Sequence, residues 1–146
     1  MRRLGKFAAL VRSERMLLVR GWIEVLVMRV ATWTLPYRKV EEMVERRATR
    51  PARDIDDKPD RDRIAWAIAV SSGYIPGGTN CLVRALATEV MLGRFGYDSE
   101  LRFGVARAAD GRLRAHAWLE SAGRPIIGDF ELDRYVTLSA PQVDKL

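Results

Sequence analysis

Residues 77–86 read GGTNCLVRAL, a glycine-containing loop that passes into a helix at the only cysteine of the chain. Asn80 or Thr79 can supply the side-chain oxygen that caps the start of such a helix, and Gly96 is placed to end it. Between these limits apolar residues recur at roughly helical spacing, at Leu82, Leu86, Val90 and Leu92. The pattern predicts a helix that begins at Cys81.

The position of Cys81 is typical of a nucleophile. A thiol becomes reactive when a helix N-terminus or a neighbouring imidazolium stabilises its thiolate. A lone cysteine is also among the residues most often buried as a small apolar group. The choice between a nucleophile and a packing residue therefore depends on what the rest of the chain brings to Cys81.

Length and composition indicate one globular domain. The chain has 146 residues, of which 48% are hydrophobic, enough to bury a substantial core. One cysteine excludes an intramolecular disulfide framework and metal sites built from several cysteines, and one histidine leaves few zinc ligands. We expect no metal and no cofactor, and a reducing compartment, the cytoplasm.

The charge balance is basic, with a formal net charge of +6 and an isoelectric point near 10.0. Nucleic acids, anionic membrane surfaces and acidic peptides are the partners that such a charge attracts. The arginines are mixed with acidic residues, and no lysine-rich tail or aromatic-interleaved basic run is present. Nucleic-acid binding is therefore disfavoured.

Neither a signal peptide nor a membrane span is predicted. The basic start resembles a signal peptide, but charges from Arg12 onward cut its apolar run short, and no small-residue cleavage site follows. Residues 16–36 are mostly apolar, yet Arg20, Glu24 and Arg29 interrupt them. We expect a packed helix there, with membrane-surface contact as the alternative.

Three further helices are predicted. The first covers residues 13–35 and is ended or kinked by Pro36, the second covers 39–47 on the surface, and residues 49–58 read as a connecting loop. Asp57 is placed to cap a third helix with Pro59 in its first turn, which runs to residues 71–73. We therefore divide one compact unit into an N-terminal helical segment with a charged connector, residues 1–58, and a catalytic core, residues 59–146.

The second half predicts an antiparallel meander. Residues 99–108 and 112–120 alternate in polarity on either side of an Asp-Gly turn at 110–111. The alternation places His116, the only histidine, opposite the more apolar face of its strand. A third short strand, residues 125–130, carries Asp129 next to His116.

Together these three residues can supply a nucleophile, a base and an orienting acid. Taken singly, His116 fits a structural role and Asp129 a turn, but their order along the chain favours catalysis. His116 would take the proton of Cys81 and pass it to the leaving group, while Asp129 would hold the imidazole. The backbone N–H of Cys81 and a nearby donor would receive the oxyanion, and the reaction would be attack on an amide or ester.

Three runs resemble the transglutaminase-like B2 proteins of lasso peptide biosynthesis: residues 80–87 (NCLVRALA), 104–107 (GVAR) and 115–120 (AHAWLE). The resemblance covers about residues 60–136. It implies an α+β fold of the papain and transglutaminase kind, in which helices and a cysteine at a helix N-terminus pack on a small antiparallel sheet. It also implies a cysteine protease that removes the leader from a ribosomally made precursor, with Cys81 as nucleophile and His116 as base.

The acid of the triad is less firmly placed by this resemblance, since Glu131 and Asp133 lie near Asp129. Some members of the family carry a small leader-recognition domain, for which this chain has no room beside its catalytic half. The resemblance thus implies a separate recognition protein of the B1 type, the precursor peptide and an ATP-dependent lasso cyclase as partners. The N-terminal helices would dock the recognition protein.

Two other functions fit the same residues. A transglutaminase or acyltransferase would pass the acyl group from Cys81 to an amine instead of water. A non-catalytic peptide-binding adaptor would bury Cys81 and leave its thiol unreactive to alkylating agents. Product mass separates the first alternative from a protease, and Cys81→Ser separates the second.

Overall fold

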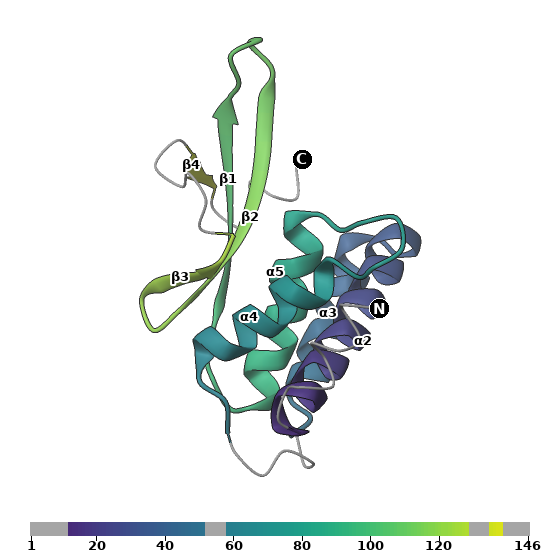
Figure 1. Ribbon diagram of the computed structural model, residues 1–146. Helices are drawn as coiled ribbons and strands as arrows, with labels where there is room; N and C mark the ends of the chain where they lie inside the picture. Colours follow the sequence, from purple (N-terminus) through teal and green to yellow (C-terminus); the bar gives the residue numbers. More distant parts are fainter. Residues whose placement is uncertain (1–11, 52–57, 129–134, 139–146) are drawn as a thin grey trace.

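The computed structural model describes residues 12–51, 58–128 and 135–138, and in these residues four helices lie on one face of a four-stranded antiparallel sheet (Figure 1). The helices are α2 (Arg12–Thr34), α3 (Tyr37–Ala48), α4 (Arg61–Ser72) and α5 (Cys81–Arg94). The strands are β1 (Glu100–Arg107), β2 (Leu113–Ser121), β3 (Arg124–Ile127) and β4 (Val136–Leu138). The predicted α+β architecture is confirmed.

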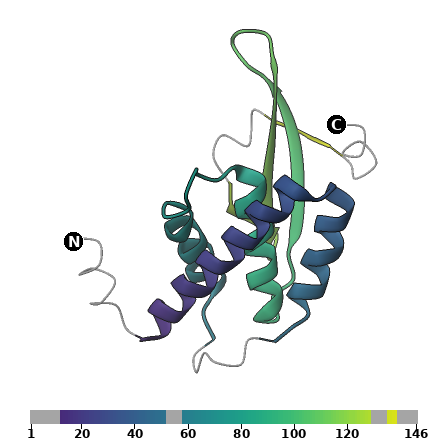
Figure 2. The same cartoon turned by 90° about the vertical axis from the view of Figure 1, so that its right-hand side faces the viewer.

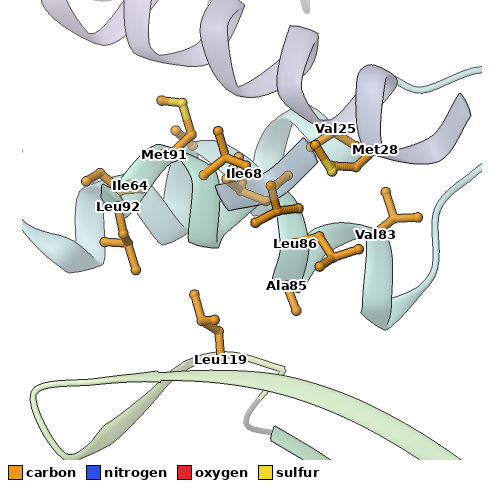
Figure 3. Packing of buried hydrophobic residues seen from close by; sticks show 14 of the residues in the cluster. Val25, Met28, Ile64, Ile68, Val83, Ala85, Leu86, Met91, Leu92 and Leu119 are labelled. Carbon is orange, nitrogen blue, oxygen red and sulfur yellow. The ribbon is translucent and has the colours of Figure 1, made fainter. Parts of the chain in front are cut away.

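The helix that starts at the cysteine lies at the centre of the core. α5 contacts the three other described helices and also β2. Its Leu86, Met91 and Leu92 are at most 1% exposed and pack among Val25 and Met28 of α2 (Figure 3). Leu119 of β2 closes this cluster from the side of the sheet (Figure 3). Because α5 is buried against both the helices and the sheet, its apolar residues cover more of its surface than the single stripe of a helix that is buried on one side.

The two N-terminal helices form where the sequence predicts them. α2 ends at Thr34, and Pro36 stands in an extended conformation immediately before α3, where a missing N–H costs nothing. Val40 and Val44 of α3 face the core, and its other described residues are exposed or half-buried. α2 contacts α4, α5 and α3, so it is covered on several sides as expected.

A buried carboxylate joins three of the helices. Glu24 of α2 is 1% exposed and accepts two hydrogen bonds from Arg47 of α3, at 2.9 Å from Nε and 2.7 Å from Nη2. Arg94 at the end of α5 contributes a third, longer bond of 3.4 Å from Nη1. A buried charge is tolerated when it is paired and hydrogen-bonded in this way.

The start of α4 corrects one sequence prediction. Asp60, not Asp57, is the N-cap, and its Oδ1 accepts a bond of 2.8 Å from the backbone N–H of Arg63. Pro59 lies before the helix, and its carbonyl accepts a bond of 2.9 Å from the Tyr97 hydroxyl. Asp57 and most of the predicted connecting loop fall outside the described residues. The predicted end of the helix, at Ser72 and Gly73, is confirmed.

The sheet contains the predicted hairpin and one strand that sequence reasoning missed. The strand order is β3-β2-β1-β4, and β1 pairs with β2 from Glu100 opposite Glu120 to Arg107 opposite Leu113. The turn between them holds Gly111 at a positive φ of 84°, which glycine adopts readily. β4 pairs with β1, although its three residues lie in a tail whose sequence carries no strand signal.

The far end of the β1–β2 hairpin extends beyond the helices (Figures 1 and 2). β3 is shorter than predicted in its described part, since it ends at Ile127 and the remaining predicted positions 129 and 130 are not described. No described helix is long and apolar enough to cross a membrane.

Candidate active site

Cys81 is the first residue of α5, as predicted. Of the two candidate caps, Asn80 acts as N-cap, in an extended conformation with its Oδ1 accepting a bond of 2.9 Å from the backbone N–H of Val83. The cap satisfies one of the free N–H groups of the first turn and fixes where the helix begins. The cysteine therefore stands at the positive end of the helix dipole.

α2 holds the loop that leads to Cys81. Arg29 Nη1 donates a bond of 2.6 Å to the Gly78 carbonyl, and Trp22 Nε1 donates one of 3.1 Å to the Tyr74 carbonyl. Gly77 has a positive φ of 79°, and a Cβ added there would lie 2.6 Å from Arg29 Nη2. A guanidinium thus occupies the space beside the loop that glycine leaves open.

Sequence reasoning missed this role of Arg29, which it treated only as a charge interrupting an apolar helix. The available signal was an arginine in the apolar second half of a long helix, together with a distant pair of glycines. No sequence pattern predicts that Arg29 contacts the loop at Gly77, because the two residues are 48 positions apart.

The sulfur of Cys81 faces the second strand of the hairpin. The backbone N–H of Ala117 on β2 points to Cys81 Sγ at 3.5 Å, and the cysteine is half-buried and free. The N-terminus of α5 and this N–H both direct hydrogen-bond donors towards the sulfur. Cys81 is thus neither fully buried nor fully exposed.

His116 precedes Ala117 on β2 and lies opposite Gly104 of β1. Its Nε2 is 2.6 Å from the carbonyl oxygen of Gly128. A carbonyl oxygen only accepts, so Nε2 carries the hydrogen in this contact. The neutral ring then has its lone pair on Nδ1, the nitrogen that remains to take a proton.

Two aromatic side chains support the imidazole. The Trp118 ring stacks on it at a centroid distance of 5.9 Å, and the Tyr135 ring lies at 5.0 Å. Trp118 is 4% exposed, and its Nε1 donates to Glu120 at 3.1 Å. Trp118 therefore stacks beside the imidazole and is itself held by Glu120. Gly104 leaves room for both rings.

The structure brings Cys81 and His116 to the same point of β2 but does not join them. The hydrogen bonds of these two residues include none between the thiol and the imidazole. Catalytic hydrogen bonds are often long in free enzymes and shorten once the substrate is bound. Asp129, Glu131 and Asp133, the candidate acids, lie outside the described residues, although Gly128, the partner of His116, directly precedes Asp129.

The described residues contain no group of three or more histidine, cysteine, aspartate and glutamate side chains placed to hold a metal ion. The chemistry that they do offer is that of a thiol nucleophile with an imidazole nearby.

An α+β unit with a cysteine at a helix start beside a strand histidine defines a class of cysteine-dependent acyl-transfer enzymes. The family model described as the transglutaminase-like superfamily matches residues 22–140, and the chain belongs to that superfamily. Comparison with the curated proteins and with the solved structures gives no match. The superfamily consists generally of cysteine-based enzymes, and its fold is one of cysteine proteases and acyltransferases.

Proposed function

We propose that this protein is a cysteine peptidase that removes the leader from a ribosomally made lasso peptide precursor. A separate leader-recognition protein of the B1 type would present the precursor, and an ATP-dependent lasso cyclase would use the product. The resemblance of residues 80–87 and 115–120 to the B2 proteins supports this role, together with membership of the superfamily.

The observation that carries the proposal is the position of Cys81 Sγ at the N-terminus of α5, beside the strand of His116. The imidazole is held by Gly128 through Nε2, which leaves Nδ1 as its basic nitrogen. A nucleophile and a base on two rigid elements are the minimum that acyl transfer requires.

The reaction would proceed in two balanced steps. In the first, His116 takes the thiol proton of Cys81, the sulfur attacks the carbonyl carbon, and the scissile C–N bond breaks as the same proton passes to the leaving amine. In the second, His116 takes a proton from water, whose oxygen attacks the thioester. The leader is released as a carboxylic acid, and the proton returns to the thiol.

The orienting group remains part of the proposal. Asp129 is our candidate, because it follows the carbonyl that already binds His116 Nε2. A carboxylate there would stabilise the imidazolium formed during attack. Glu131 and Asp133 are the alternatives, and Asp129→Asn beside Glu131→Gln and Asp133→Asn would identify the acid by loss of rate.

Mass spectrometry of a leader-bearing precursor incubated with the protein and its recognition partner tests the proposal. We expect one cut at the leader–core bond with the wild type and none with Cys81→Ala or His116→Ala. Asp62→Asn is the matched control, since Asp62 lies outside the N-terminal helical segment, its side chain is 69% exposed and it pairs at 2.9 Å with Arg124, whose side chain is 50% exposed. It should cleave at the wild-type rate.

The product separates the alternatives. If the released leader carries an added amine instead of a free carboxylate, its mass differs accordingly. That product would make the protein an acyltransferase. Intact precursor with every variant, although the leader binds, would exclude the peptidase and favour an adaptor.

A further inference from the structure

Near Cys81, the edge of β2 that faces away from β1 has no strand partner among the described residues at positions 113–115. β3 pairs with β2 only from Leu119 to Ser121. Within the described residues no strand continues this pairing along residues 113–118, where β1 covers only the other side of β2. A strand edge of this kind presents free N–H and C=O groups that can pair with another chain.

The direction of these groups follows from two contacts. Leu119 pairs with Ile127 of β3, and the Ala117 N–H points to Cys81 Sγ. Backbone groups alternate in direction along a strand, so Ala115 and Leu113 direct their N–H and C=O groups to this same edge. Both residues are exposed, Leu113 to 69%.

We propose that residues 113–115 of β2 bind an extended peptide as an added strand, which delivers a carbonyl of that peptide to Cys81. Ala115 is two residues from Ala117, about 7 Å along the strand. A peptide paired with Ala115 therefore reaches the sulfur with its next residues. The reaction that follows binding depends on the proposed function. Binding of the peptide to the strand edge does not depend on it.

The charge of the hairpin end selects the kind of peptide. Arg107, Arg112 and Arg114 are exposed there, and Asp110 is the one acid between them. Asp110 pairs only with Arg112, at 3.9 Å, in a position where both side chains are largely exposed. The surplus positive charge favours an extended segment that carries aspartate or glutamate.

The same charge disfavours a second copy of this chain as the occupant. Edge-to-edge pairing of two copies would bring their arginines together, and like charges across a pair of strands are destabilising. Backbone pairing supplies affinity without requiring a particular side chain, which suits a substrate recognised elsewhere by a partner protein.

Nuclear magnetic resonance of the ¹⁵N-labelled full chain, in its Cys81→Ala form, tests the proposal with defined probes. The probes are a decapeptide of alternating threonine and glutamate and its counterpart with lysine in place of glutamate. We expect the glutamate peptide to shift the amide signals of Leu113 and Ala115 at millimolar concentration, at least tenfold more strongly than the lysine peptide. No shift at these amides, or equal shifts with both peptides, would overturn the proposal.

Two variants at one position provide the control. Ala115→Pro removes the N–H at the free edge, where proline is tolerated, whereas Ala115→Val keeps it. We expect at least a tenfold loss of peptide affinity with proline and less than a twofold change with valine, with both variants melting as cooperatively as the parent. Equal peptide binding by the two variants would exclude this strand edge as the binding site. A wild-type dimer that Ala115→Pro dissociates would show that the edge binds a second copy of the chain, and would also overturn the proposal.

Failure of this site and failure of the proposed function give different results. Precursor cleavage that Ala115→Pro leaves unchanged would exclude the edge and keep the peptidase. Peptide binding at Leu113 and Ala115 by a chain that cleaves no precursor would keep the edge and exclude the peptidase.

Discussion

Asn80 is one residue from the nucleophile and caps its helix, so a change in its side chain alters stability and charge at the same point. Removing the cap with Asn80→Ala should lower the free energy of unfolding by about 1 kcal/mol. Asn80→Asp keeps an acceptor for the Val83 N–H and should preserve stability. It also adds a negative charge beside the sulfur of Cys81, which should slow alkylation by iodoacetamide about three- to tenfold at pH 7, because a nearby negative charge disfavours the anionic form that reacts.

Alkylation reports on Cys81 alone, because it is the only cysteine of the chain. Asn80→Ser serves as the control, since it keeps a neutral cap and should match the wild type in both measurements. Faster alkylation of Asn80→Asp than of Asn80→Ser would contradict the electrostatic explanation.

Gly104 determines whether His116 keeps its aromatic support. A Cβ at this position would lie 2.9 Å from Trp118 Cζ3 and 2.9 Å from Tyr135 Cβ, closer than such atoms approach. Gly104→Ala should therefore displace one of the rings, lower the free energy of unfolding by about 1–3 kcal/mol and shift the imidazole resonances. Since His116 is the only histidine, its NMR signals report the change directly.

Gly73→Ala is the matched control for this substitution. Gly73 has an ordinary φ of −69° at the end of α4, and the nearest atom to an added Cβ is the Val70 carbonyl oxygen at 3.4 Å. It should change stability by less than about 0.5 kcal/mol and leave the imidazole resonances in place.

At the scale of elements, the contact between α3 and α5 carries a pH dependence. Glu89 of α5 is partly buried and faces Glu41 and Glu45 of α3, and burial followed by repulsion from these two carboxylates raises its pKa from 4.5 to about 7. Between those values the folded chain keeps a proton on Glu89 that the unfolded chain has lost. Stability should therefore fall as the pH rises from about 4.5 to 7, and level off above.

Glu89→Gln should remove this loss. Each unit of pKa shift is worth about 1.4 kcal/mol, so the variant should be more stable than the wild type at pH 8 by up to about 3 kcal/mol. Urea unfolding at pH 5 and pH 8 measures the difference. The same advantage at both pH values would show that a packing effect, and not the charge, is responsible.

Elements were predictable where their signals are local. The cysteine helix, the Asp-Gly hairpin and the end of α2 before Pro36 each depend on a few adjacent residues, and all three are confirmed. The error at Asp57 arose because two aspartates near Pro59 can each cap a helix, and only the bond to Arg63 distinguishes them. β4 has no local signal, since β1 stabilises it through long-range pairing.

The candidate site shows the same limit more sharply. Cys81 and His116 stand out as single residues of their kind, so the sequence alone indicates them. The hydrogen bond from Arg29 to the Gly78 carbonyl and the one from His116 to the Gly128 carbonyl both join a side chain to a distant backbone group. No residue pattern encodes such contacts, because any residue at position 78 or 128 has a carbonyl.

At the scale of the whole molecule, the described N-terminal helices α2 and α3 pack against α5, the helix that begins at Cys81. α5 is covered by the sheet on one side and by α2 on the other, and the buried cluster includes residues of both (Figure 3). Arg29 and Trp22 extend this dependence to the loop before Cys81. The superfamily match, which spans residues 22–140, likewise includes most of α2.

The fragment of residues 59–146 should consequently fail to fold by itself. It would expose the face of α5 that packs on Val25 and Met28 and would leave Arg94 without Glu24. The full chain should unfold in one cooperative transition by circular dichroism and calorimetry, whereas the fragment should show no transition and bind a hydrophobic dye. Adding a peptide of residues 12–51 in excess should restore part of the helical signal, because it supplies the missing face. A fragment that melts cooperatively alone would show instead that α2 is an appendage of an independent catalytic core.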